Sequence, residues 1–264
     1  MAPLPPELIQ EIIEIYVEGS LTRAASIAGV CRDFNDCVRP VLSRTLMYYQ
    51  TEPLWQWPVP VHELPQWLEK NGKYCPGIIN LAVWVNTSAN DLTTLLPSLS
   101  TLRLLSLSIN LYELFNRRKF LKHEAQNDVF RTITHLDVIH SILGWEDIEG
   151  IAFFPCLTHL CLPELMSHPS YRSDILRALR DCKQLRVLVI IAGSFVPDQD
   201  IRVVRANRLF NRDGDDPRIV ELEREYVDDW EKGATGKKDM WALADEIVER
   251  RLVDRRDKEK RNIF

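Results

Sequence analysis

The sequence predicts an α/β fold with a small N-terminal helical module, a body of repeated strand and helix units, and a C-terminal helix. Apolar residues recur at helical spacing in the first fifty residues, and one strand-like apolar pattern recurs five times further on. Asp239 starts a second helical pattern near the C-terminus. We therefore divide the chain into a helical module (1–50), a connecting segment (51–77), a repeat body (78–222) and a C-terminal cap with a charged tail (223–264).

Composition and charge exclude several classes of protein. The 264 residues are 45% hydrophobic, which is enough apolar material for a sizeable core, and the net charge of −5 leaves no excess of Lys and Arg for a phosphate backbone or an anionic membrane. The start lacks a signal-peptide pattern, and no apolar run approaches the roughly 20 residues of a bilayer span. We expect a soluble protein of the cytoplasm or nucleus, with no nucleic-acid or membrane partner and with reduced cysteines.

Three short helices are expected in the first fifty residues. Pro6 suits the first turn of a helix, where its missing N–H has no consequence, and apolar residues follow at helical spacing. Gly19-Ser20 ends this helix, and a second periodic stretch follows. The third helix is expected to end at Pro40, with an apolar pattern continuing to Leu46. Helices this short bury little surface alone, so part of it should meet another element or another chain.

These residues resemble the F-box family, whose pattern is Leu-Pro, an amphipathic first helix, and Val-Cys-Arg-x-Trp thirty-odd positions later. Leu4-Pro5 and Val30-Cys31-Arg32 match at the right spacing, whereas Phe34 stands where the family usually has Trp and so lacks the indole N–H. The resemblance implies docking onto the Skp-type linker of a cullin-RING ubiquitin ligase. The contact residues that it implies are Leu4, Pro5, Leu8, Ile12, Val30, Cys31 and Phe34.

The alternative for these helices is purely structural. Repeat proteins need terminal caps, because an uncovered end repeat exposes its core. The module could therefore close one end of the repeat body without binding a partner.

The repeat body is predicted from the pattern apolar-x-x-apolar-x-apolar. Its copies start 24, 31, 24 and 28 residues apart, close to the spacing of leucine-rich repeats, in which a short strand and a helix stack on their neighbours. A doubly wound α/β sheet is the competing architecture, but no strand is followed by a Gly-rich phosphate turn. The copies are Ile78, Leu81 and Val83; Leu102, Leu105 and Leu107; Ile133, Leu136 and Val138; Leu157, Leu160 and Leu162; and Leu185, Leu188 and Ile190.

Strand positions between these core residues should face an open concave side, which we expect to bind a target protein. Val187 and Val189 are among these outward positions, and the predicted target-binding residues are Trp84, Ser106, His135, Asp137 and His159. His135 and His159 occupy equivalent places in adjacent copies, and with Cys156 and Cys161 they form the best metal-like cluster. A shared exposed polar position explains the same equivalence, so we expect no metal and no cofactor.

The C-terminal segment is expected to close the far end of the repeats. Residues 218–222 fit one further strand or a helix start, and the β-branched Ile219 and Val220 favour the strand. Asp239 is the expected N-cap of a helix that would serve as the C-terminal cap. The stretch from Pro217 to Arg251 resembles the ends of divergent F-box-like families of mushroom-forming fungi.

No catalytic motif is present: the sequence lacks a nucleophile elbow, a dinucleotide loop, a phosphate-binding loop and a zinc-protease motif. We therefore expect a protein that is not an enzyme. The predicted function is a substrate-recognition adaptor of an SCF-type ubiquitin ligase, in which the module binds the linker and the repeat face binds a target protein. The alternative is a stand-alone repeat scaffold with the helices as its cap.

Overall fold

The structure is a computed structural model. The described residues are 5–17, 21–43, 45–49, 66, 69–70, 80–84, 106–109, 128–138, 154–163, 171–191, 216–222, 229, 232–233 and 237–261. Within them, no helix combines the length and the apolar character that crossing a membrane requires.

The three N-terminal helices are present: α1 (Pro6–Val17), α2 (Leu21–Ala28) and α3 (Arg32–Ser43). The carbonyl of Pro5 accepts hydrogen bonds from the N–H groups of Leu8 and Ile9, each at 3.1 Å, so α1 begins where the sequence predicts it. The predicted end of α3 at Pro40 is wrong. This helix continues through Pro40 to Ser43 with one backbone hydrogen bond fewer.

The helical module has a core of its own. Ile13, Val17, Ala24 and Val38 are buried against one another, and each of the three helices contributes to this cluster. The Asn35 side chain donates a 3.2 Å hydrogen bond to the carbonyl of Ala28, which satisfies an acceptor at the end of α2. Four half-buried side chains pack against this core: Ile9, Ile27, Phe34 and Cys37.

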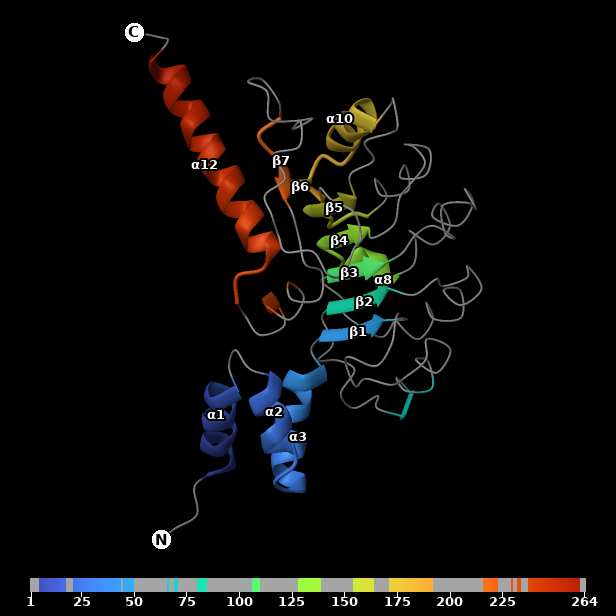
Figure 1. Ribbon diagram of the computed structural model, residues 1–264, viewed down its shortest axis with the longest axis vertical. Helices are drawn as coiled ribbons and strands as arrows, with labels where there is room; N and C mark the ends of the chain where they lie inside the picture. The colour runs from blue at the N-terminus through green and yellow to red at the C-terminus, as the bar shows by residue number, and fades with distance from the viewer. Residues whose placement is uncertain are drawn as a thin grey trace, which may run out of the picture.

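The described part of the chain contains seven parallel strands in one sheet, and their spatial order is their order in the chain (Figure 1). The predicted mixed α/β class with a parallel sheet is therefore confirmed. A doubly wound sheet reverses its strand order at a switch point, and the described strands show no such reversal. The strands are β1 (Thr45–Tyr49), β2 (Asn80–Trp84), β3 (Ser106–Ile109), β4 (His135–Val138), β5 (His159–Pro163), β6 (Val187–Ile191) and β7 (Ile219–Leu222).

The first strand lies inside the range that the sequence assigned to the helical module. Leu46 of β1 pairs with Leu81 of β2, and Tyr48 pairs with Val83. The position equivalent to Ile78 is therefore Ser43, and this polar residue interrupts the apolar pattern. The sheet begins at Thr45, so the predicted module boundary at residue 50 is too late.

The second copy of the repeat was predicted two residues out of register. Leu81 pairs with Leu107, where the sequence pattern had matched it to Leu105. Leu104, Leu107 and Ile109 satisfy the same apolar spacing, so the pattern alone could not separate the two registers. A shift of two residues keeps every side chain on its own face of the strand, so the predicted faces were unaffected.

Helices lie on both sides of the stacked strands. On one face, Leu136, Leu160 and Leu188 form a fully buried row through neighbouring strands. Figure 1 shows α8 (Asp128–Arg131) and α10 (Tyr171–Asp181) on one side of the stacked strands and α12 (Met240–Arg261) on the other.

The sequence predicted that the C-terminal helix closes the end of the sheet, but α12 packs on a face of the sheet instead. Its buried residues Met240, Ala244 and Val248 pack across β5, β6 and β7 in a cluster with Cys161, Val187, Val189, Ile191 and Val220. The guanidinium of Arg251 also donates a hydrogen bond to the carbonyl of Ile219. The physical reason is that all five residues of β6 are buried, so this strand needs a cover on both faces.

Candidate functional site

The first candidate surface lies on α1. Leu8, Ile12, Ile15 and Tyr16 are 45%, 54%, 65% and 52% exposed, and their spacing of i, i+4, i+7 and i+8 places them on one side of the helix. We call these four residues the α1 apolar stripe. Ile13 and Val17 lie on the adjacent side and belong to the module's core. The helix is therefore apolar on two sides. The module's core uses one of them, and on the other the guanidinium of Arg23 lies over the Tyr16 ring, 5.6 Å from its centroid.

The residues predicted to bind the linker protein divide into three groups. Pro5, Leu8, Ile12, Val30 and Cys31 are exposed, and Val30 is 66% exposed. Phe34 is half-buried and packs against the module's core, and its backbone N–H donates to Cys31 Sγ at 3.5 Å. Leu4 lies outside the described residues. Ile15 and Tyr16 were not predicted as site residues, although the same helical spacing marks them.

The residues predicted on an open concave face mostly lie beneath α12. Register pairs His135 with His159, and Asp137 with Cys161, so the predicted face is correct for these positions. The predicted openness is wrong here: His159 is 4% exposed, Asp137 is fully buried and His135 is half-buried. The side chains of Trp84 and Ser106 lie outside the described part of the chain.

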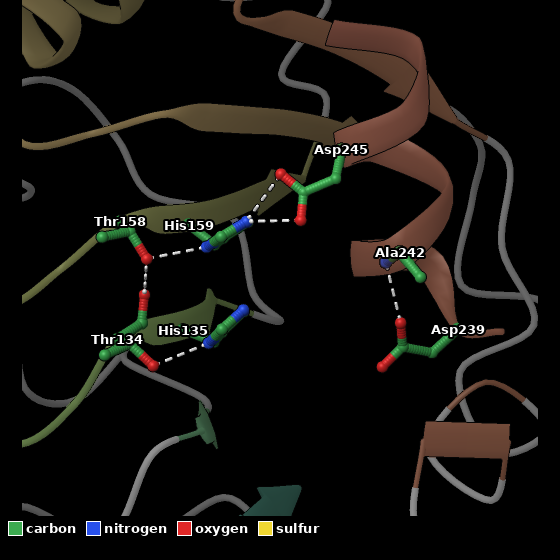
Figure 2. A network of polar contacts seen from close by, with 7 residues as sticks. All are labelled: Thr134, His135, Thr158, His159, Asp239, Ala242 and Asp245. Carbon is green, nitrogen blue, oxygen red and sulfur yellow. Dashed lines mark hydrogen bonds and ion pairs between the residues drawn. The ribbon is translucent and has the colours of Figure 1, made fainter. Parts of the chain in front are cut away.

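The two histidines form a stacked pair (Figure 2). Their ring centroids are 4.1 Å apart, with 11° between the ring planes. Each Nδ1 lies 2.8 Å from the hydroxyl oxygen of the preceding threonine, Thr134 or Thr158. The Thr158 hydroxyl oxygen also lies 3.1 Å from the Thr134 carbonyl oxygen, which links the two copies. A Thr-His dipeptide repeated in adjacent strands thus fixes both rings, with Nε2 of each directed toward α12.

The first turns of α12 provide the contacts for this pair. Nε2 of His159 lies 3.2 and 3.3 Å from the two carboxylate oxygens of Asp245. The Trp241 indole meets both imidazole rings edge-on, at centroid distances of 5.2 Å to His135 and 5.7 Å to His159. Asp239 accepts a 2.9 Å hydrogen bond from the N–H of Ala242, which confirms it as the N-cap. We call His135, His159 and Asp245 the histidine cluster.

Burial dominates the electrostatics of the cluster. It lowers the pKa of His135 to about 4, with a further decrease from His159 and a partly opposing effect of Asp245. Burial also lowers the pKa of His159, although the Asp245 carboxylate opposes this through its charge and its hydrogen bond. Both rings are therefore predominantly neutral near pH 7. At the histidine cluster, the contact between α12 and the sheet therefore joins two neutral imidazoles to the side chains of Asp245 and Trp241.

The side chains considered as metal ligands are not assembled into a site. Cys156 is exposed, and Cys161 is buried in the cluster beneath α12. Across the described ranges, no three His, Cys, Asp or Glu residues are arranged to hold a metal ion. Comparison with known proteins returned no matching family model and no matching curated protein.

Proposed function

We propose that the chain is an adaptor whose N-terminal helices bind a Skp-type linker of a cullin-RING ubiquitin ligase. The observation that supports this proposal is the exposed α1 apolar stripe on a module that already has its own core. Anchors at i, i+4 and i+7 of an amphipathic helix are the usual means by which a helix binds an apolar groove. The type of partner that we propose follows from the resemblance of the Leu-Pro and Val-Cys-Arg motifs to the F-box family.

The stripe offers enough apolar surface for specific binding. Full burial of a large aliphatic or aromatic side chain contributes about 1.5–3 kcal/mol, and the stripe residues are about half exposed. Completing their burial is therefore worth roughly 1 kcal/mol for each side chain. Val30 adds a fifth exposed apolar residue on the same module. A few residues usually carry most of the affinity of a protein interface, so a set of five side chains is large enough for this role.

The cap hypothesis is supported less well. A cap would bury the apolar surface of the module against the first strand, whereas the α1 apolar stripe is exposed. Among the described elements, the main contacts of α1, α2 and α3 are with one another. Figure 1 places the module beyond β1, at the end of the sheet, so a limited capping role and partner binding are compatible.

The rest of the proposal concerns the target protein. We propose that the repeat body binds the target protein, with Trp84 and Ser106 as the remaining predicted residues of the binding face. His135, Asp137 and His159 leave this set, because α12 covers the face there. The adaptor would contribute proximity: holding a lysine of the target near a charged ubiquitin carrier raises the effective concentration without adding a catalytic group.

Co-expression with a Skp-type linker followed by size-exclusion chromatography tests the proposal. We expect the wild-type chain to co-elute with the linker and Leu8→Asp/Ile12→Asp to elute alone, because each Asp places a charge in the apolar contact. The matched control is Leu252→Asp/Val253→Asp, which makes the same change at two exposed apolar residues of α12 and should keep the complex.

Thermal unfolding of the same variants separates the two hypotheses. If Leu8→Asp/Ile12→Asp abolishes linker binding and leaves the melting temperature unchanged, the stripe is a docking surface. If this variant loses its fold, the helices serve as a cap. A folded wild-type chain that never co-elutes with the linker contradicts the proposal.

A further inference from the structure

The contact between α12 and the sheet contains a titratable cluster within an apolar surface. Met240, Ala244 and Val248 supply the apolar side of this contact, and the histidine cluster lies beside it. We propose that the histidine cluster is a pH-sensitive latch: below about pH 6, protonation of the stacked pair weakens the hold on α12 and raises the population in which β5–β7 are uncovered. This inference does not depend on the proposed function.

One proton is tolerated by the cluster. Asp245 faces His159 directly, and the negative charge of Asp239 favours the same proton, whereas Arg186 opposes it. Thr158 has a single hydroxyl hydrogen, which goes either to Nδ1 of His159 or to the Thr134 carbonyl. A neutral His159 that donates from Nε2 to Asp245 uses that hydrogen at Nδ1. A protonated His159 donates from both nitrogens and leaves it for Thr134.

The second proton is not compensated. A charged His135 would stack at 4.1 Å on a charged His159, and the single carboxylate of Asp245 already bonds to His159. The Trp241 indole is T-shaped to both imidazole rings and carries no charge, so it supplies no counter-charge for the second proton. Among the described strands, Asp137 lies on the same face, fully buried two positions along β4. Separation of α12 from the sheet lets water reach both imidazoles and removes this penalty.

The direction of the pH effect follows from the difference in the pKa of His135 between the closed and open forms of α12. The pKa of His135 is lowered from 6.5 to about 4 when α12 is closed, so closure favours the neutral ring. The stability that this provides is complete above pH 6.5 and decreases as the pH falls toward 4. If His135 regains its ordinary pKa in the open form, the opening equilibrium rises about 30-fold between pH 7.5 and pH 5.

The labelling rates of two buried cysteines test this proposal. Cys161 lies beneath α12 in the apolar cluster, whereas Cys182 follows α10 and is buried outside that cluster. The full-length chain is treated with 4,4′-dithiodipyridine at pH 7.5, 6 and 5, and the labelled peptides are quantified by mass spectrometry. Rates are corrected with a small thiol measured at each pH. We expect the corrected rate of Cys161 to rise about 30-fold from pH 7.5 to pH 5, with little change at Cys182.

Variants connect this rate to the latch. His135→Gln removes the group with the strongly lowered pKa, so the rise at Cys161 should largely disappear. Asp245→Asn removes the compensating charge and should make the rise steeper. The proposal is overturned if the Cys161 rate is independent of pH, if Cys161 and Cys182 rise together as in global unfolding, or if the rise persists unchanged in both variants.

Discussion

Truncation of Val189 is the sharpest test of the covered sheet face. The sequence pattern placed this residue on an open concave side, whereas the structure buries it completely beneath α12. Val189→Ala removes two methyl groups from a packed site, each worth about 0.8 kcal/mol of transfer free energy, and leaves a cavity that adds to the loss. We expect the free energy of unfolding to fall by about 2–3 kcal/mol.

The assay is urea unfolding of three variants measured side by side. The matched control Val253→Ala makes the same change on α12 at a residue that is 46% exposed, and it should cost no more than about 0.5 kcal/mol. Leu188→Ala changes the neighbouring residue on the opposite face and should be at least as costly as Val189→Ala, because Leu188 is also fully buried. A cost for Val189→Ala equal to that of Val253→Ala would show that α12 does not cover β6 in solution.

Three further predictions concern α12, the histidines and the turn before β7. Asp239→Ala removes the N-cap of α12 and should lower the free energy of unfolding by about 1 kcal/mol, measured by urea unfolding. The urea midpoint of the wild-type chain should fall as the pH drops from 6.5 toward 4, because burial lowers the pKa of His135, and this fall should be smaller in His135→Gln. Arg218→Ala removes hydrogen bonds to the Asp216 carboxylate and the Leu185 carbonyl and should cost about 1–3 kcal/mol by thermal unfolding.

The sequence predicted the strands well where one apolar row continued from copy to copy. Leu136, Leu160 and Leu188 were matched correctly because each begins an apolar-x-apolar step after a turn, and register pairs them directly. The first strand was missed for a local reason: Ser43 stands where the other copies have an aliphatic residue. Pattern matching detects a repeat only where its residues keep their character, whereas the backbone hydrogen bonds of a strand do not depend on that position.

The sequence contained a signal that α12 covers β6. The signal was missed because the strand was interpreted as having one buried face and one open face. Val187 to Ile191 is an uninterrupted apolar run, which is typical of a strand buried on both faces, so an open side at Val187 and Val189 was improbable on physical grounds. The histidine cluster had no comparable signal. His159 and Asp245 are 86 residues apart, and spacing within one element cannot predict such a pair. Only the rule that a buried polar group needs a partner indicates that one must exist.

The polar part of the α12 contact determines where the helix sits along the sheet. Met240, Ala244 and Val248 follow one another at intervals of four residues, so a slide of α12 by about one turn, 5.4 Å, would replace one apolar residue by the next against the same strands. The bond between Asp245 and His159 has no equivalent one turn away, because Glu249 and Trp241 occupy those positions and neither reproduces a short carboxylate at that distance. A slide would therefore leave His159 buried without its acceptor, at a cost of about 1–3 kcal/mol. The apolar residues supply the affinity of α12 for the sheet, and the histidine cluster, together with the hydrogen bond from Arg251 to the Ile219 carbonyl, supplies its register.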